Sequence, residues 1–177
     1  MDRIAAIKGR EILNAKGRPT VEAQLITERG IRVTASVPSG TSRGKYEAFE
    51  LYDGETRHNG RGARKAAENI STEICRALAG MDVADQEAID RTLCRLDGTP
   101  DKHRLGGNAL LAASVAAAKA GAASTNQPVY RYLGQKDIRP ALPDILATVI
   151  AGGVFSTSGM EFEDYMAVFH GFSSFLK

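Results

Sequence analysis

Residues 108–123 form the segment of this chain that most restricts its fold. Nearly all of its side chains are those of Ala, Leu, Val and Ser, and its one charge is at Lys119. A helix of this composition is apolar on most faces, so several neighbouring elements have to cover it. The rest of the chain must therefore supply the elements that enclose this helix.

Three segments near the start of the chain have the two-residue alternation of β-strands. They are residues 3–10, 20–27 and 31–37, and turn signals at residues 16–19 and 28–30 separate them. This arrangement predicts an antiparallel meander. The side chains expected to face inward are Val21, Ala23 and Leu25, followed by Ile31, Val33, Ala35 and Val37.

A glycine-rich loop at residues 38–44 ends the strand pattern, and helical periods follow it. Residues 63–78 carry apolar side chains at helical spacing, and Gly80 marks the expected end of that helix. Asp85 is placed to cap a second helix that runs to about Leu96. With residues 108–123, these helices predict an α+β fold in which a three-stranded antiparallel meander is followed by a helical bundle.

Residues 139–177 have a different texture from the rest of the chain. Two β-type runs, residues 142–150 and 162–169, stand there without other strand signals around them. We therefore expect two domains, residues 1–138 and 139–177. An isolated pair of strands is only marginally stable in water, so the second domain is expected to be the less stable one.

The composition is that of a globular protein and excludes several functional classes. Hydrophobic residues make up 43% and charged residues 25%, and the formal net charge is +2. Nucleic-acid-binding modules gather Lys and Arg on one surface, so no nucleic-acid partner is predicted. No segment approaches the roughly 20 apolar residues of a membrane span, and the first residues hold no apolar run of signal-peptide length. The expected location is the cytoplasm, without a membrane partner.

The cysteines and histidines do not suggest a metal or nucleophile site. Cys75 and Cys94 lie 19 residues apart without CxxC spacing, whereas zinc needs three or four converging ligands. Both cysteines fall in predicted helices and are expected to be small core residues. The histidines, His58, His103 and His170, stand in turn-like contexts and are expected at the surface.

The glycine-rich loop at residues 38–44 is the one local feature that could bind a ligand. Such a loop exposes backbone N–H groups to a phosphate, or supports a metal site. It lacks the terminal GK[ST] of a P-loop, however, and the alternative is an ordinary connection between two elements. The residues of the loop leave both interpretations open.

Several strings along the chain resemble the enolase family in their order and spacing. They cover nearly the whole chain, which makes chance agreement negligible. The strings are GREIL (residues 9–13), GRPTVE (17–22), VPSG (37–40), EAFELYDG (47–54), GMDV (80–83), LDGTP (96–100), LGGNA (105–109) and YRYLG (130–134).

For the fold, the resemblance implies an enolase-like amino-terminal domain that caps a modified (β/α)8 barrel, with a short fragment of that barrel in residues 139–177. For activity, it implies phosphopyruvate hydratase, a glycolytic lyase that reversibly dehydrates 2-phosphoglycerate to phosphoenolpyruvate. In the family a lysine removes a proton next to the carboxylate, and magnesium stabilises the resulting enediolate. Ser39 matches the serine of the family's mobile lid, which ligates the second magnesium.

The barrel-like segment departs from the family at site positions. Phe155 stands where the family has a substrate-contacting histidine, and Thr148 and Ala151 replace asparagines. Glu163 and Asp164 match a Gln-Glu pair of the second barrel strand, so they are the candidate catalytic residues here. Asp164 is one methylene shorter than the family's glutamate, a displacement of roughly 1 Å that can lower a rate by about 10².

Other matched positions concern the lid and the subunit interface. In the lid region, Arg43 replaces a threonine and Tyr52 replaces an arginine. In family dimers the amino-terminal domain touches the partner's barrel, and Arg10, Lys16 and Glu22 lie in the matching segment. The resemblance therefore implies a homo-oligomer, or pairing with another enolase-type subunit.

The family's three metal-ligand carboxylates, its lysine base and a further glutamate belong to barrel strands beyond residue 177. We therefore expect the chain to be inactive alone and to bind magnesium only when a barrel is present. The alternatives are a non-catalytic interaction module, which self-associates or pairs with an enolase subunit, and a relic without a role. Aromatic residues typical of interfaces gather in the tail. They are Phe162, Tyr165, Phe169, Phe172 and Phe175.

Overall fold

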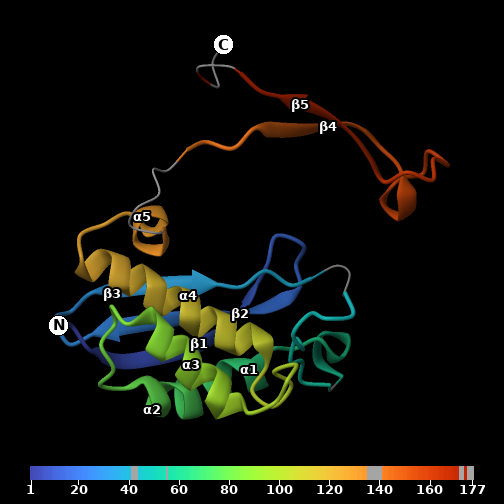
Figure 1. Cartoon of the computed structure of the whole chain (residues 1–177). Helices are drawn as coiled ribbons and strands as arrows, with labels where there is room; N and C mark the ends of the chain where they lie inside the picture. Colours follow the sequence, from blue (N-terminus) through green and yellow to red (C-terminus); the bar gives the residue numbers. More distant parts are fainter. Residues whose placement is uncertain (41–43, 55, 135–140, 172–173, 175–177) are drawn as a thin grey trace. The chain divides into compact units, whose positions relative to one another are not determined.

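The computed structural model describes residues 1–40, 44–54, 56–134, 141–171 and 174. The chain divides into two compact units, Met1–Lys136 and Asp137–Lys177, and each is considered by itself (Figure 1). The domain boundary expected at residue 138 falls within residues 135–140, which lie outside the described part. Arg43, Phe172 and Phe175 lie outside it as well.

The first unit begins with the predicted meander. Strands β1 (Ile4–Leu13), β2 (Pro19–Thr27) and β3 (Arg32–Ser36) pair antiparallel in the order β1-β2-β3. The turns between them place Gly17 at φ 67° and Gly30 at φ 87°, a region that glycine enters without steric cost. Alternation then sends Val21, Ala23 and Leu25 to one face, where all three are fully buried, which confirms their predicted direction.

Helices cover that buried face of the sheet (Figure 1). The predicted helix at residues 63–78 is α1 (Arg64–Asn69) and α2 (Cys75–Leu78), joined by a single π-type stretch, Ile70–Ile74. Helix α1 packs on β1, while α4 (Gly107–Ser124) packs on β2 and β3. Helix α3 (Gln86–Asp97) then packs on α4. The predicted α+β order, a sheet followed by helices, is confirmed.

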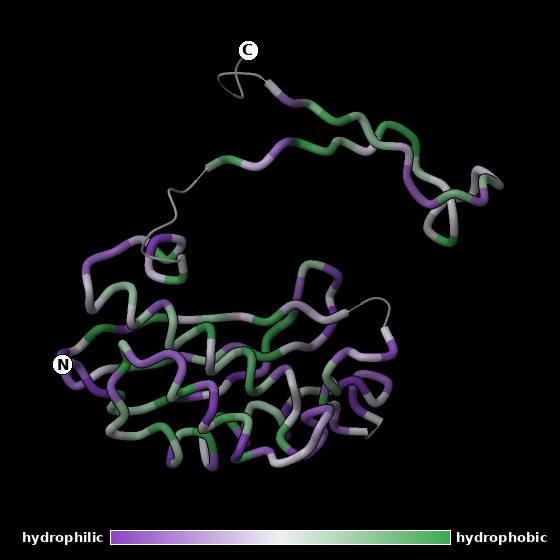
Figure 2. Tube along the Cα trace, viewed as in Figure 1, coloured by the Kyte–Doolittle hydropathy of each residue, from purple (hydrophilic) through white to green (hydrophobic). Residues whose placement is uncertain are grey.

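Helix α4 is enclosed as its composition predicts. Its small side chains let the sheet and α3 approach closely, and most of its residues are buried. At the far end, α5 (Val129–Leu133) folds back, and the Tyr132 hydroxyl donates to the carbonyl of Ala84 at 3.0 Å. Figure 2 shows the apolar residues gathered toward the interior of this unit. The largest buried side chains are those of Ile4, Leu25, Ile70, Ile74, Leu78, Ile89 and Leu105.

Helix α3 buries only one stripe of its surface, which corrects the prediction for one cysteine. Ile89 and Leu93 face the core, whereas Cys94 points to the exposed side. The expectation that Cys94 is a core residue was wrong, because the next position on a helix is turned by about 100°. Cys75 is half-buried. The three histidines are exposed, as predicted.

The second unit is a hairpin of β4 (Ile145–Ala151) and β5 (Asp164–Phe169), which pair antiparallel with each other. A short 3₁₀ turn, Gly153–Phe155, follows β4. Nearly every described side chain of the hairpin is exposed, including Phe162 at 71% and Val149 at 68%. The described residues of this unit therefore form no buried core of their own.

Candidate functional site

The segment of residues 47–54 is held against the start of α4. The buried side chain of Asn108 accepts from the backbone N–H of Leu51 and donates to its carbonyl, both at 3.1 Å. The N–H of Gly107 donates to the carbonyl of Phe49 at 2.7 Å. Gly106 has φ 96°, and a Cβ there would lie 2.6 Å from the Leu51 Cβ. The LGGNA string thus fixes the EAFEL string.

A second polar cluster fixes the path that follows. Arg57 donates to both carboxylate oxygens of Glu11, at 2.9 Å for Nη1 to Oε2, and the Ala63 N–H donates to Oε2 at 2.6 Å. The hydrogen bond from Arg57 is the main cause that lowers the pKa of Glu11, with the Ala63 N–H contributing. Asp53 accepts from the backbone N–H of Lys65 at 2.9 Å, which anchors the first turn of α1.

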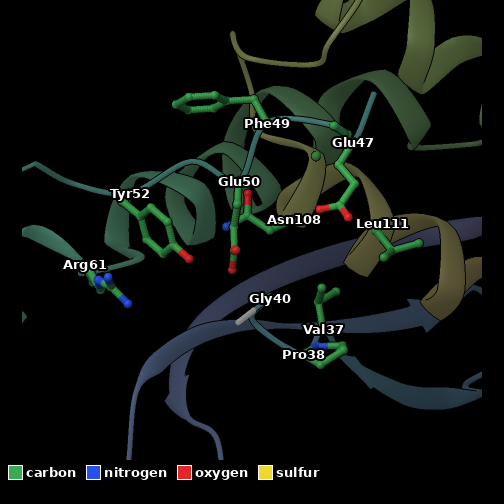
Figure 3. Close-up of a pocket in the computed structure, with 12 residues that line it drawn as sticks. Val37, Pro38, Gly40, Glu47, Phe49, Glu50, Tyr52, Arg61, Asn108 and Leu111 are labelled. Atoms are coloured by element: carbon green, nitrogen blue, oxygen red, sulfur yellow. The ribbon is translucent and has the colours of Figure 1, made fainter. Parts of the chain in front are cut away.

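A cavity of about 670 Å3 lies between the end of β3, residues 47–52 and α4 (Figure 3). Its apolar lining includes Val37, Pro38 and Leu111, and the Leu111 side chain is 49% exposed although most residues of α4 are buried. The volume falls within the roughly 300–1,000 Å3 of typical ligand sites. The charged and polar lining side chains are those of Glu47, Glu50, Tyr52, Arg61 and Asn108.

Two of these polar side chains, Glu50 and Tyr52, have unusual surroundings. Burial, together with the hydrogen bond to Glu50 and its negative charge, raises the pKa of Tyr52 to about 12. The phenol therefore stays protonated at neutral pH. Oxygen Oε1 of Glu50 is buried and has no hydrogen-bond partner among the described residues. A buried carboxylate oxygen without a hydrogen bond raises the free energy of the folded protein. A hydrogen-bond donor that reached this oxygen would therefore be bound favourably.

Comparison with known proteins identifies the family of this chain. A family model for the enolase amino-terminal domain matches residues 4–133, about three quarters of the chain. The chain belongs to the enolase family. Enolase from Methanopyrus kandleri is 45% identical over 175 residues, and enolase from Rubrobacter xylanophilus is 43% identical over 176. Each alignment covers 99% of this chain but 41% of the relative, so the chain spans less than half the length of these enolases.

Ser39, which matches the lid serine of the enolase family, makes an internal contact. Its half-buried hydroxyl donates to the carbonyl of Pro19 at 3.2 Å. No group of three or more His, Cys, Asp or Glu side chains that could hold a metal occurs within the described ranges. Magnesium requires several oxygen ligands, usually with carboxylates, so the described residues do not fit this ion. The magnesium role of Ser39 stays a prediction.

The residues matched to the enolase subunit interface lie on and beside the outer face of the sheet. Arg10 forms an ion pair with Glu22, its register partner on β2, and Ser36 donates to Glu22 at 3.0 Å. These contacts form a polar row across all three strands. Lys16 is exposed in the turn between β1 and β2. The three predicted interface residues are thus close in the fold, and their contact with a partner stays a prediction.

The hairpin brings together the two strings that match barrel strands of the enolase family. Asp164 begins β5 opposite Ala151, and the Gly152 N–H donates to the carbonyl of Glu163 at 2.6 Å. Both candidate carboxylates, Glu163 and Asp164, are exposed. Phe155 ends the turn after β4, and its side chain lies outside the described part. The catalytic roles of Glu163 and Asp164 stay predictions.

Sequence reasoning missed Glu11, which holds Arg57 and Ala63, and Glu50, which lines the cavity. Glu11 pairs with Val21 in the sheet register, so its carboxylate sits on the inward face. A charged residue at an inward strand position was an available signal, because such a group needs a partner from elsewhere in the chain. Glu50 stands between Phe49 and Leu51 without strand or helix periodicity, so no comparable signal was available for it.

Proposed function

We propose that this chain supplies the capping and lid part of an enolase. The whole enzyme is a phosphopyruvate hydratase, the glycolytic lyase that reversibly dehydrates 2-phosphoglycerate to phosphoenolpyruvate with magnesium in the cytoplasm. The observation that supports this proposal is the match of 99% of the chain to 41% of two enolases, with the matched strings holding one another in the fold. Among the described helices, none is long and apolar enough to cross a membrane.

We propose further that residues 1–177 do not complete the reaction by themselves. The Ser39 hydroxyl is engaged with Pro19, and the described carboxylates form no metal-binding cluster. Glu163 and Asp164 are exposed on a hairpin without a core, which gives their carboxylates no fixed low-dielectric surroundings. The chain's own contribution is therefore to position the lid segment and present the cap surface.

Calorimetric titration with magnesium tests this division of roles. The chain alone should show no micromolar magnesium site. When it is mixed with the unmatched part of the Methanopyrus kandleri enolase as a second polypeptide, dehydration of 2-phosphoglycerate should appear. A low-micromolar magnesium site on the chain alone would contradict the proposal.

A second candidate function, a non-catalytic interaction module, is favoured by the hairpin. Its exposed apolar side chains include Leu146, Val168 and Phe169, and among the described residues each strand pairs on one edge only. In this hypothesis the chain self-associates, or pairs with an enolase subunit. Light scattering over a range of ~1 to 50 µM should show assembly that weakens when residues 141–177 are deleted. A monomer throughout, with no enolase recovered as partner from the source cell, would oppose it.

A further inference from the structure

The carboxylate of Glu50 is a group that neither proposed function uses. Oxygen Oε1 is buried without a hydrogen-bond partner among the described residues, although the side chain lines a cavity of about 670 Å3. The carboxylate already accepts a hydrogen bond from the Tyr52 hydroxyl, which leaves Oε1 as the oxygen that lacks a donor. A donor that enters the cavity would therefore remove an existing cost in the folded protein.

The rest of the lining defines what kind of donor fits. Val37, Pro38 and Leu111 form an apolar part, while Glu47 adds a second, exposed carboxylate near Leu111 (Figure 3). Arg61 is the cation in the lining, and it lies beyond Tyr52, away from Glu47. The end of the cavity next to Glu50 and Glu47 is thus acidic, with an apolar surface beside it.

We propose that this cavity binds an arginine side chain carried by a partner polypeptide. Arginine combines an apolar stem with a planar cation that binds a carboxylate through two hydrogen bonds and stacks on aromatic rings. The stem would lie along Leu111 and Pro38, and the guanidinium would meet Glu50 beside Tyr52. The cavity is larger than one arginine side chain requires, which favours a peptide segment with an apolar neighbour. This inference does not depend on whether the chain takes part in dehydration.

Two peptides that differ in one charge test the inference on the full chain. The probe is acetyl-Ala-Leu-Arg-Leu-Ala-amide, and its match carries citrulline, a neutral isostere, in place of arginine. Amide chemical shifts of residues 47–52 and 107–111 should move with the arginine peptide, with a dissociation constant of ~1 mM or tighter. The citrulline peptide should bind at least about tenfold more weakly, since it lacks the charge.

Protein variants locate the site. Glu50→Gln keeps the shape of the side chain and should weaken arginine-peptide binding at least about tenfold. Glu28 is an exposed residue in the turn after β2, outside the cavity lining, so Glu28→Gln should leave binding unchanged. Equal binding of the two peptides, no binding at ~5 mM, or full binding by the Glu50→Gln variant would each overturn the proposal. The comparison of the arginine and citrulline peptides uses the unmodified chain. It therefore tests the proposal even if Glu50→Gln fails to fold.

Discussion

At the scale of single residues, Glu11 is held by an ion pair with Arg57 and by the N–H of Ala63. Glu11→Ala leaves the buried Ala63 N–H and the half-buried Arg57 without their acceptor, so we expect a loss of about 2–3 kcal/mol in unfolding free energy. Urea denaturation followed by circular dichroism measures it. Glu87→Ala is the matched control and should lose about 0.5 kcal/mol or less, since the Glu87–Arg91 pair is exposed. Equal losses in the two variants would contradict the assigned role.

The same carboxylate predicts a pH dependence. The folded protein lowers the pKa of Glu11 below 4.5, so its contribution to stability is fully present above that value. It is lost as the pH falls through the lower, folded-state pKa. Between pH 7 and acid conditions, Glu11→Gln should therefore show a flatter stability curve than the unmodified chain. Parallel curves would show that Glu11 does not carry this linkage.

The hydrogen-bond partners of some residues could be predicted from the sequence, and those of others could not. The cap at Asp85 was predictable because its contact is local: its carboxylate accepts from the N–H of Ala88 at 3.0 Å. The partner of Glu11 was not, since Arg57 is 46 residues away. The same holds for Asn108, whose partner Leu51 is 57 residues away. Contacts of this kind depend on how the helices pack on the sheet.

At the scale of elements, the cap of α3 is the simplest test. Asp85→Ala removes the acceptor for the Ala88 N–H, and the expected loss is about 1 kcal/mol in unfolding free energy. Asp85→Ser should keep most of the stability, because serine is also a good N-cap residue. Thermal unfolding of both variants measures the difference. If the serine variant is as unstable as the alanine variant, capping is not the cause.

Asn108 of α4 is expected to hold residues 47–52, which form one wall of the cavity. Asn108→Ala removes both side-chain hydrogen bonds to Leu51, so the segment of residues 47–52 should open more readily. Amide hydrogen exchange at Leu51 should accelerate at least about tenfold relative to the unmodified chain. The amide of Ala117, deep in α4, serves as the internal reference. Unchanged protection at Leu51 would show that other contacts hold this wall.

Most helices and strands were predictable because their apolar side chains recur at regular spacing along the sequence. The three strands and the buried α4 follow directly from alternation and from the lack of a polar face. The division of the helix at residues 63–78 was not predictable, because the π-type stretch Ile70–Ile74 has ordinary helical residues. It occurs where Ser71 accepts from the Gly9 N–H at 2.9 Å, a contact with the edge of β1 that only the tertiary structure shows.

At the scale of the whole molecule, the chain combines a well-packed first unit with a hairpin whose described side chains are mostly exposed. The family was recognisable from the sequence because its strings occur in order along nearly the whole chain. Two of these strings, residues 47–54 and 105–109, contact each other in the fold. The cavity was not, since its walls come from β3, residues 47–52 and α4. The roles predicted for Ser39, Glu163 and Asp164 would need further groups, because the described residues form no metal-binding cluster.

We propose that residues 1–177 form an enolase cap that does not catalyse the reaction alone. The most direct measurement is the formation of phosphoenolpyruvate from 2-phosphoglycerate by the purified chain, followed by ultraviolet absorbance at saturating magnesium. We predict no turnover within 10³-fold of a typical enzyme median of about 10 s⁻¹. Turnover above roughly 0.01 s⁻¹ that copurifies with the chain would contradict the account.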